Sequence, residues 1–263
     1  MRILVTNDDG INAPGIKILN QIALELAGPH GEVWLVAPES EQSGVGHCIN
    51  YINPTRVSKV SDQKIAIQGS PADCVLAGLH YISRKGKPDL ILSGINKGNN
   101  SGENTIYSGT VGAAMEGALQ GIPSIALSQY FGPENITLEN PFEAASQFGV
   151  SLIMDIYKKT NWGDGGYKTF YNVNFPPVQS INVKGTRVVS QGLRNTKFNV
   201  EPAIAPNGRE FLWIKGNRQD IPTEIGTDVH ANLNGYISVT PMTCNLTSFE
   251  LIDDLKKKLE CEK

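Results

Sequence analysis

The sequence predicts an α/β protein built on a doubly wound, mostly parallel sheet. Short apolar runs, typical of buried strands, alternate along the chain with segments whose apolar residues recur at helical spacing. The first strand, the first helix and the second strand all fit within residues 2–37. That arrangement is a βαβ unit, which implies parallel strands and a right-handed crossover.

The elements follow in order along the first part of the chain. The helix at 71–82 has the clearest start, because Ser70 suits the N-cap, Pro71 the first helical position and Asp73 the first turn. Gly28 and Pro29 end the first helix. We expect strands at 2–6, 32–37, 64–67, 89–93, 124–127 and 171–175, and helices at 15–27, 71–82, 109–120 and 142–158.

The alternation of strand-like and helix-like segments ends at about residue 185. Residues 187–240 lack helical periodicity and contain short β-like runs at 210–214 and 236–239, separated by Pro, Gly and Asn. We interpret this part as a β-rich extension with a projecting hairpin.

The last segment, residues 248–260, predicts an amphipathic helix with Phe249, Ile252, Leu255 and Leu259 on one face. Such a terminal helix packs either on its own sheet or on a neighbouring subunit. We therefore divide the chain into a Rossmann-like core at 1–185 and an extension at 186–263, which together form one domain.

The composition is that of an ordinary globular protein, with 263 residues, 40% of them hydrophobic and 19% charged. A formal net charge of -3 indicates no stable complex with nucleic acid and no general affinity for an anionic membrane. Cys48, Cys74, Cys244 and Cys261 lack the spacing of a zinc site or a disulfide framework. No export signal or membrane-spanning run is visible, so we expect a cytoplasmic protein.

Polar residues gather in three loops that follow predicted strands, where open parallel sheets bind their ligands. Asp8 and Asp9 come directly after the first strand. Two adjacent carboxylates are costly to hold together without a cation, and a hard divalent metal removes that cost. The alternative is that Asn and Asp are here simply turn residues, with Asp8 capping the following helix. The pair alone does not decide between the two.

The second loop, residues 38–47, contains Ser43 and His47. The Ser43 hydroxyl is able to ligate a metal or bind phosphate, and His47 is a candidate general acid. A flexible surface loop is the alternative interpretation.

The third loop, residues 93–110, is rich in Asn and Gly, and its amide oxygens suit a hard cation. It ends in Ser108-Gly109-Thr110 where a helix is expected to begin. Free N–H groups and two hydroxyls at such a helix start form an anion site. The chain has neither a Walker motif nor a G-x-G-x-x-G fingerprint, which argues against ATP or NAD as a cofactor.

Taken together, these loops resemble one family, the stationary-phase survival protein SurE, whose members are metal-dependent nucleotidases. The resemblance runs over nearly the whole chain in the same order. The matching segments are RILVTNDDGINAPGI (2–16), VAPESEQSGVGH (36–47), GSPADCV (69–75), LILSGINKGNN (90–100), YSGTVGAAMEG (107–117), NVNFP (172–176) and TDVHANLNGYISVTPM (227–242).

The resemblance implies a metal site and a phosphate site. One divalent ion per subunit, Mg²⁺ or Mn²⁺, is expected on Asp8, Asp9, Ser43 and Asn96, with the two aspartates as catalytic residues. Asn100 and the Ser108-Gly109-Thr110 turn are expected to face the phosphate. One departure is visible: Asn104 stands where the family often carries Asp, which puts in doubt any role that needs a carboxylate there.

The resemblance also implies substrates and partners. Family members hydrolyse nucleoside 5′- and 3′-monophosphates, and some degrade short polyphosphate. They exchange a hairpin and the C-terminal segment between subunits to form homodimers, which often pair into homotetramers. For the nucleoside part, Tyr51, Tyr107 and Phe131 are candidate stacking residues, although aromatic side chains mostly serve burial.

Four possibilities remain for the chemistry of the site. Water attacks phosphorus in line, or Asp8 attacks and forms an aspartyl phosphate. We prefer water, because a metal-bound carboxylate is a poor nucleophile. The same site also fits a nucleotide sensor without turnover, or less well a glycosyltransferase, whose paired carboxylates are usually separated by one residue.

Overall fold

A nine-stranded sheet forms the centre of the described part of the chain, with strand order β3-β4-β2-β1-β5-β6-β7-β11-β8. The computed structural model describes residues 1–83, 86–163, 165–195, 198–216 and 218–260. The strands from β4 to β7 run parallel, whereas β3 and β11 run antiparallel to their inner neighbours. The strands are β1 (Arg2–Thr6), β2 (Glu32–Pro38), β3 (Val57–Ser61), β4 (Lys64–Ile67), β5 (Leu90–Lys97), β6 (Ser124–Gln129), β7 (Thr169–Phe175), β8 (Thr186–Val188) and β11 (Ile237–Thr243).

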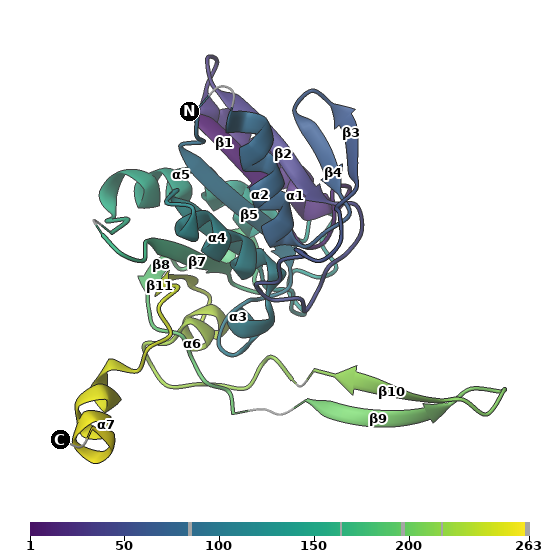
Figure 1. Ribbon diagram of the computed structural model, residues 1–263, viewed down its shortest axis with the longest axis vertical. Helices are drawn as coiled ribbons and strands as arrows, with labels where there is room; N and C mark the ends of the chain where they lie inside the picture. The colour runs from purple at the N-terminus through teal and green to yellow at the C-terminus, as the bar shows by residue number, and fades with distance from the viewer. Residues whose placement is uncertain (84–85, 164, 196–197, 217, 261–263) are drawn as a thin grey trace.

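Helices cover both faces of the sheet (Figure 1). Successive strand residues point to opposite faces, so Val5 joins the core under α1 and α5, while Leu4 joins the core under α2 and α4. The predicted doubly wound α/β fold is therefore confirmed. The helices are α1 (Pro14–Ala27), α2 (Pro71–Ile82), α3 (Asn104–Tyr107), α4 (Gly109–Leu119), α5 (Glu143–Lys159), α6 (Asp228–Leu233) and α7 (Ile252–Leu259), with single 3₁₀ turns at Ser180–Asn182 and Phe249–Leu251.

The prediction of a loop from residue 94 onward was wrong for its first residues. Strand β5 continues to Lys97, and Asn96 pairs with Ser128 of β6 across an irregularity in the ladder. Gly94 makes this possible with a φ of +135°, at a point where a Cβ atom would lie 2.2 Å from the Leu127 carbonyl oxygen. The Gly and Asn residues that suggest a loop are here part of a bent strand.

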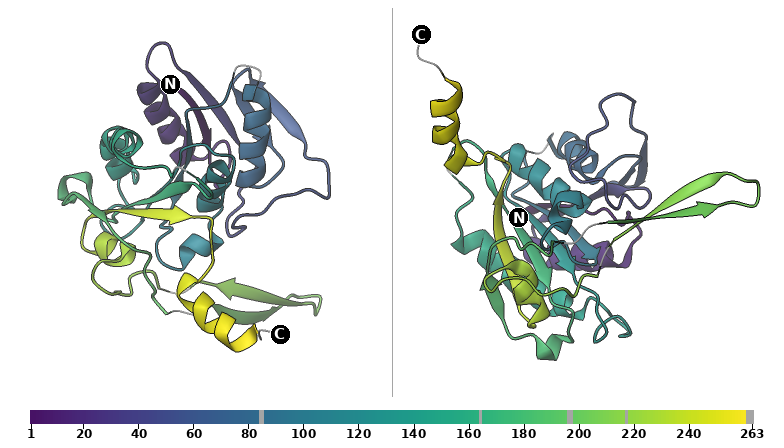
Figure 2. Two further views of the ribbon diagram at one scale, coloured as in Figure 1. Left: turned by 60° about the vertical axis from the view of Figure 1, so that its left-hand side comes forward. Right: turned by 90° about the horizontal axis from the view of Figure 1, so that it is seen from below.

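The predicted β-rich extension is confirmed as a projecting hairpin. Strands β9 (Asn199–Ile204) and β10 (Glu210–Lys215) pair antiparallel and extend away from the sheet (Figures 1 and 2). The expected absence of helix from 187–240 was wrong at α6, whose six residues are too few to show periodicity. Strands β8 and β11 join the main sheet, so the extension shares the core of the preceding residues.

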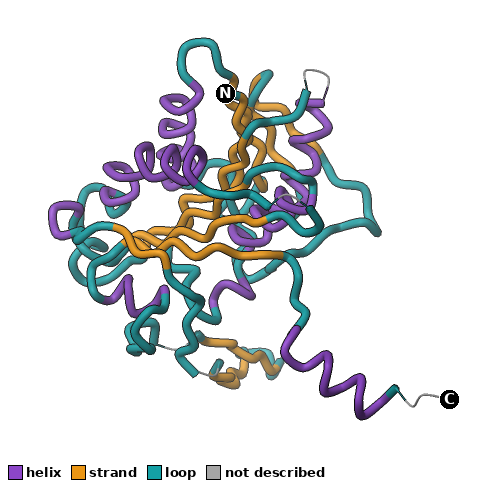
Figure 3. Tube along the Cα trace, turned by 90° about the vertical axis from the view of Figure 1, so that its left-hand side faces the viewer, coloured by secondary structure: helices purple, strands orange, loops and turns teal. Residues whose placement is uncertain are grey.

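The final helix also lies away from the sheet (Figure 3). None of the residues of α7 is buried, and Phe249 and Leu259 are 64% and 75% exposed. In the described residues no helix combines the length and apolar character needed to cross a bilayer. Cys48, Cys74 and Cys244 are free thiols, and Cys261 lies outside the described residues.

Candidate metal and phosphate site

Asp8 lies at the carboxyl end of β1 and is buried, with 3% of its surface exposed. Its carboxylate accepts two hydrogen bonds from Thr110, one from the backbone N–H (3.1 Å) and one from the hydroxyl (2.5 Å). Burial raises the pKa of Asp8 from 3.8 to about 6, and the neighbouring Asp9 carboxylate acts in the same direction. Thr110 at the start of α4 therefore holds the Asp8 carboxylate in a buried position, where its negative charge is poorly solvated.

The close approach of Asp8 to α4 depends on Gly109. A Cβ atom at this position would lie 2.9 Å from the Asp8 Cβ and 3.0 Å from Cγ of Pro71. Ser108 caps the helix by accepting a hydrogen bond from the backbone N–H of Val111 (3.1 Å). The predicted Ser108-Gly109-Thr110 turn thus sits against Asp8. Because Thr110 donates to Asp8, the Gly109 N–H and the Ser108 hydroxyl hydrogen are the groups of this turn that suit an anion.

Asp9 faces the neighbouring strand. Its carboxylate accepts a hydrogen bond from the backbone N–H of Lys97 (3.0 Å), the residue that follows Asn96 on β5. Burial raises the pKa of Asp9, and the nearby charge of Glu41 contributes to the increase. The half-buried Asn96 donates its amide N–H to the Gly98 carbonyl (2.9 Å), so its amide oxygen is the atom suited to a cation.

Ser43 is exposed, and its hydroxyl donates to Glu41 (2.7 Å). The loop that carries it is nevertheless tied to the site on both sides of Ser43. The backbone N–H of Gln42 donates to the Asp8 carbonyl (2.7 Å), and that of Gly46 donates to the Tyr107 carbonyl (3.0 Å). The structure thus brings the Ser43 loop to Asp8, while the Ser43 hydroxyl itself is bonded to Glu41.

His47 holds the far end of the same loop. Its Nε2 lies 2.7 Å from Oε2 of the buried Glu116 on α4, and this hydrogen bond lowers the pKa of Glu116. Gly112 of α4 leaves room for the backbone of the Ser43 loop, because a Cβ at this position would lie 2.5 Å from the Gly46 carbonyl oxygen. The contacts give His47, a candidate general acid, the role of fastening the loop to α4.

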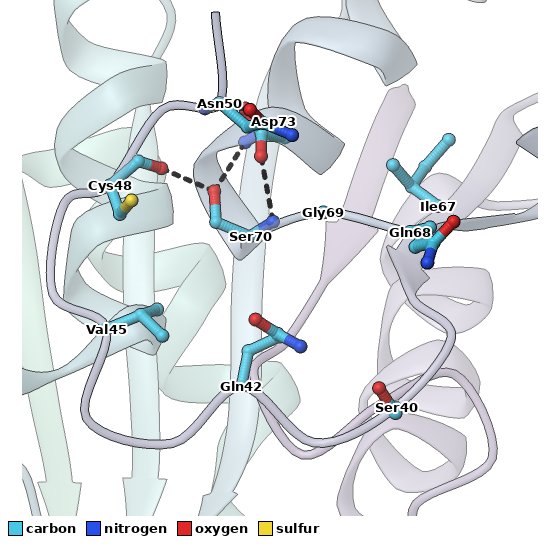
Figure 4. Close-up of a pocket in the computed structure, with 10 residues that line it drawn as sticks. All are labelled: Ser40, Gln42, Val45, Cys48, Asn50, Ile67, Gln68, Gly69, Ser70 and Asp73. Atoms are coloured by element: carbon cyan, nitrogen blue, oxygen red, sulfur yellow. Dashed lines mark hydrogen bonds between the residues drawn. The ribbon is translucent and has the colours of Figure 1, made fainter. Parts of the chain in front are cut away.

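The GSPADCV segment (69–75) anchors Cys48 and Asn50, which come directly after the Ser43 loop. Ser70 and Asp73 form a capping box at the start of α2, and the Ser70 hydroxyl donates to the Cys48 carbonyl (Figure 4). The Asp73 carboxylate also accepts a hydrogen bond from the backbone N–H of Asn50 (3.0 Å). Gln42, Val45 and these residues surround a small pocket between the loop and α2 (Figure 4).

Asn100 is buried, and its side chain points into the sheet. Its amide N–H donates to the Ser128 hydroxyl (2.8 Å), while its backbone N–H and carbonyl bind the side chains of Asn174 and Asn172 on β7. In this arrangement Asn100 fixes the loop after β5 against β6 and β7. The NVNFP segment therefore serves as the support for that loop.

Two functional supports escaped the sequence analysis. The buried guanidinium of Arg194 donates to Ser101 and Asn99, and the buried carboxylate of Asp228 accepts from the backbone N–H of Gly102 (3.0 Å). Both residues come from the extension, and both hold the loop that follows β5. A single Arg in an irregular segment carries no pattern, whereas Asp228 lies in the TDVHANLNGYISVTPM match and was the one signal available.

Asn104 is also held by residues around the loop that follows β5. Its side-chain amide donates to Oδ1 of Asn99 (3.2 Å) and to Oε1 of Gln219 (2.7 Å). These contacts need a donor, which a carboxylate does not supply. The departure from the family pattern thus fits the neighbours that Asn104 has in this chain.

The donor chemistry fits a hard divalent cation. Within the described ranges, no three His, Cys, Asp or Glu side chains are grouped to hold a metal. Asp8 and Asp9 therefore need further oxygen ligands, and Asn96 and the Ser43 loop are the nearest predicted ones. Two carboxylates with an amide and a hydroxyl oxygen suit Mg²⁺ or Mn²⁺ and not zinc.

Comparison with known proteins agrees with this architecture. The family model described as Survival protein SurE matches residues 3–198. The chain belongs to the SurE family. The 5'-nucleotidase SurE of Jannaschia sp. (strain CCS1) is 57% identical and covers 99% of this chain and 100% of its own length. That of Roseobacter denitrificans is 58% identical over 97% of this chain and 98% of its own length.

A solved SurE structure shares the fold. The crystal structure of the SurE protein from Aquifex aeolicus matches with a TM-score of 0.80 and 40% sequence identity, over 98% of this chain and 99% of that chain. The predicted resemblance to the SurE family is therefore confirmed in sequence and in structure.

Proposed function

We propose that this SurE chain is a metal-dependent nucleotidase that releases phosphate from nucleoside 5′-monophosphates. The observation that carries the proposal is the buried Asp8, adjacent to Asp9 and held against the first turn of α4 by Thr110. Relatives that match nearly the whole chain are named 5'-nucleotidases, which supports the same activity here. We extend the proposal to nucleoside 3′-monophosphates and to short polyphosphate, in line with the family resemblance.

In this proposal Asp8, Asp9, Ser43 and Asn96 would hold one Mg²⁺ or Mn²⁺ ion, and the exposed Ser43 side chain would turn from Glu41 to reach it. A bound divalent ion supplies Lewis-acid activation of the phosphoryl group and of water. Binding requires both aspartates in their charged form, which a cation favours despite their burial.

The residues around the ion orient the substrate. The Gly109 N–H and the Ser108 hydroxyl donate to phosphoryl oxygens at the N-terminus of α4, where the helix dipole favours negative charge. Thr110 keeps Asp8 in position, and Asp9 accepts the proton of the attacking water. Asn100 supports the loop that leads to this turn, and its place facing the phosphate, implied by the family resemblance, stays a prediction. A cytoplasmic location remains a prediction from the sequence.

The direct test is release of inorganic phosphate from 5′-AMP, 3′-AMP, a short polyphosphate and a generic aryl phosphate, each with Mg²⁺ or Mn²⁺ and then with excess EDTA. We expect release from 5′-AMP that requires a divalent ion and stops on chelation. If 5′-AMP binds and no phosphate appears with any metal, the chain is a nucleotide sensor. If release continues in EDTA, the metal does not take part.

A further inference from the structure

A side pocket opens beside the proposed metal site and shares Asp9 with it. The pocket has a volume of about 620 Å³, within the range of about 300–1,000 Å³ that is usual for small-molecule sites. Its residues divide by character. Asp9, Glu41 and Lys97 line one end, which we call the charged end. Phe131, Ile136 and Phe142 line the other, which we call the apolar end although Glu139 and Asn140 of the same segment also line the pocket.

The apolar end is built by the segment between β6 and α5, which has a fixed shape. Asn135 is fully buried in this segment, where it accepts a hydrogen bond from the backbone N–H of Gly132 (2.8 Å) and donates to the Tyr130 carbonyl (2.8 Å). Phe131 packs edge-on against Phe142, with ring centroids 5.0 Å apart. Ile136 is 54% exposed, so the wall presents apolar surface that its own chain does not cover.

The other two aromatic candidates for stacking lie elsewhere. Tyr51 is 86% exposed on the loop beyond Ser43, and Tyr107 packs edge-on against Phe198 at the base of the hairpin. Neither residue lines the side pocket. Phe131 is thus the candidate that shares a pocket with a proposed metal ligand.

We propose that the side pocket binds the nucleoside part of the substrate, an inference that rests on the proposed nucleotidase function. With the phosphate at the α4 turn, the ribose lies at the charged end, where its hydroxyls donate to the Glu41 carboxylate. The base lies against Phe131 and covers Ile136. A nucleoside matches the pocket because it is polar at the sugar and flat and apolar at the base. Phe131 and Ile136 therefore set the preference for nucleotides over other phosphate esters.

The experiment compares kcat/KM for 5′-AMP with kcat/KM for ribose 5-phosphate, which differs by the absence of the base. Phe131→Ala removes the stacking surface, and Ile136→Asp places a charge on the apolar wall at an exposed position that the fold tolerates. Ile181→Asp, at an isoleucine that is 83% exposed and outside the pocket, is the matched control. Tyr51→Ala tests the rival stacking residue.

We expect Phe131→Ala and Ile136→Asp to lower kcat/KM for 5′-AMP by about tenfold or more, because the base loses its stacking ring in the first variant and meets a charge in the second. The value for ribose 5-phosphate stays unchanged in both, and the control changes neither value. An unchanged ratio in both variants, or a loss in Tyr51→Ala instead, overturns the side pocket and leaves the nucleotidase function standing.

Binding of adenosine separates this inference from the activity. Adenosine carries no phosphate, so its binding, followed by calorimetry or by ligand-observed NMR, reports on the pocket even if the chain hydrolyses nothing. We expect the wild-type chain and Ile181→Asp to bind adenosine, and Ile136→Asp to bind it at least about tenfold more weakly. Equal binding by the wild type and both variants, or no binding by the wild type, contradicts the proposal.

Discussion

At the scale of single residues, Asp8 combines burial with two hydrogen bonds from Thr110, and burial dominates its pKa. The folded chain holds the Asp8 proton up to a pKa of about 6, whereas the ordinary value is 3.8. Between these values the folded state binds more protons than the unfolded state. The stability of the metal-free chain therefore falls as pH rises from about 4 to about 6, by up to about 3 kcal/mol from this residue.

This contribution is measured by denaturant unfolding of the metal-free chain at several pH values in that window. Asp8→Asn is the comparison, because an amide keeps the shape and has no proton to lose. We expect the free energy of unfolding of the wild type to decline relative to that of Asp8→Asn as pH rises from about 4 to about 6. If the stabilities of the two chains change in parallel with pH, Asp8 does not have a raised pKa in the folded state.

The same two aspartates carry the proposed reaction. Asp8→Asn and Asp9→Asn should each reduce turnover of 5′-AMP by at least about a hundredfold, the usual cost of removing one central electrostatic group. Circular dichroism and the unfolding transition check that the fold is intact. Near-normal rates in both variants would show that the metal lies elsewhere.

At the scale of elements, the position of α4 relative to β1 determines the geometry of the site. Gly109→Ala forces a Cβ atom to 2.9 Å from Asp8 and 3.0 Å from Pro71, so the helix start or the carboxylate has to move. We expect turnover of 5′-AMP to fall by about tenfold to a hundredfold, because small misplacements of catalytic groups have effects of that size.

Gly165→Ala is the control for this change, since a Cβ atom there has nothing within 4 Å. It should leave turnover and stability as they are. If Gly109→Ala turns over 5′-AMP at the wild-type rate, the close contact between α4 and Asp8 is not required for the reaction.

Elements with local signals were predictable from the sequence. The helix at 71–82 was placed without error because Ser70, Pro71 and Asp73 are neighbours whose roles depend only on one another. Asn96 was assigned to a loop because the strand bend depends on Gly94 passing close to Leu127 of another strand. Arg194 and Asp228 act on residues 93 and 126 positions away, and no local pattern reveals such a contact.

At the scale of the whole molecule, two parts leave large apolar side chains uncovered. Phe211, Trp213 and Ile214 of the hairpin are 54%, 64% and 72% exposed, and α7 has no buried residue. Surfaces of this kind usually meet a partner. We propose that the partner is a second copy of the chain, with the hairpin and the C-terminal segment exchanged into homodimers or homotetramers.

Removal of the residues after Thr247 tests this assembly, because it deletes α7 and leaves β11 and the sheet complete. We expect multi-angle light scattering to show a smaller species than the full chain forms, or a loss of solubility. The double variant Trp213→Asp with Ile214→Asp tests whether the hairpin contributes to the same assembly. An unchanged dimer or tetramer in both cases contradicts the exchange.

In the proposed site, Asp8 and Asp9 after β1, Asn96 on β5 and Ser43 in the loop after β2 hold one divalent ion per chain. The most direct test is a calorimetric titration of Mn²⁺ into the wild-type chain and into Asp9→Asn at neutral pH. We predict one site per chain in the wild type and at least about tenfold weaker binding in the variant, because a carboxylate ligand is lost. Binding of equal strength and stoichiometry in both chains would place the metal away from Asp9 and contradict the account.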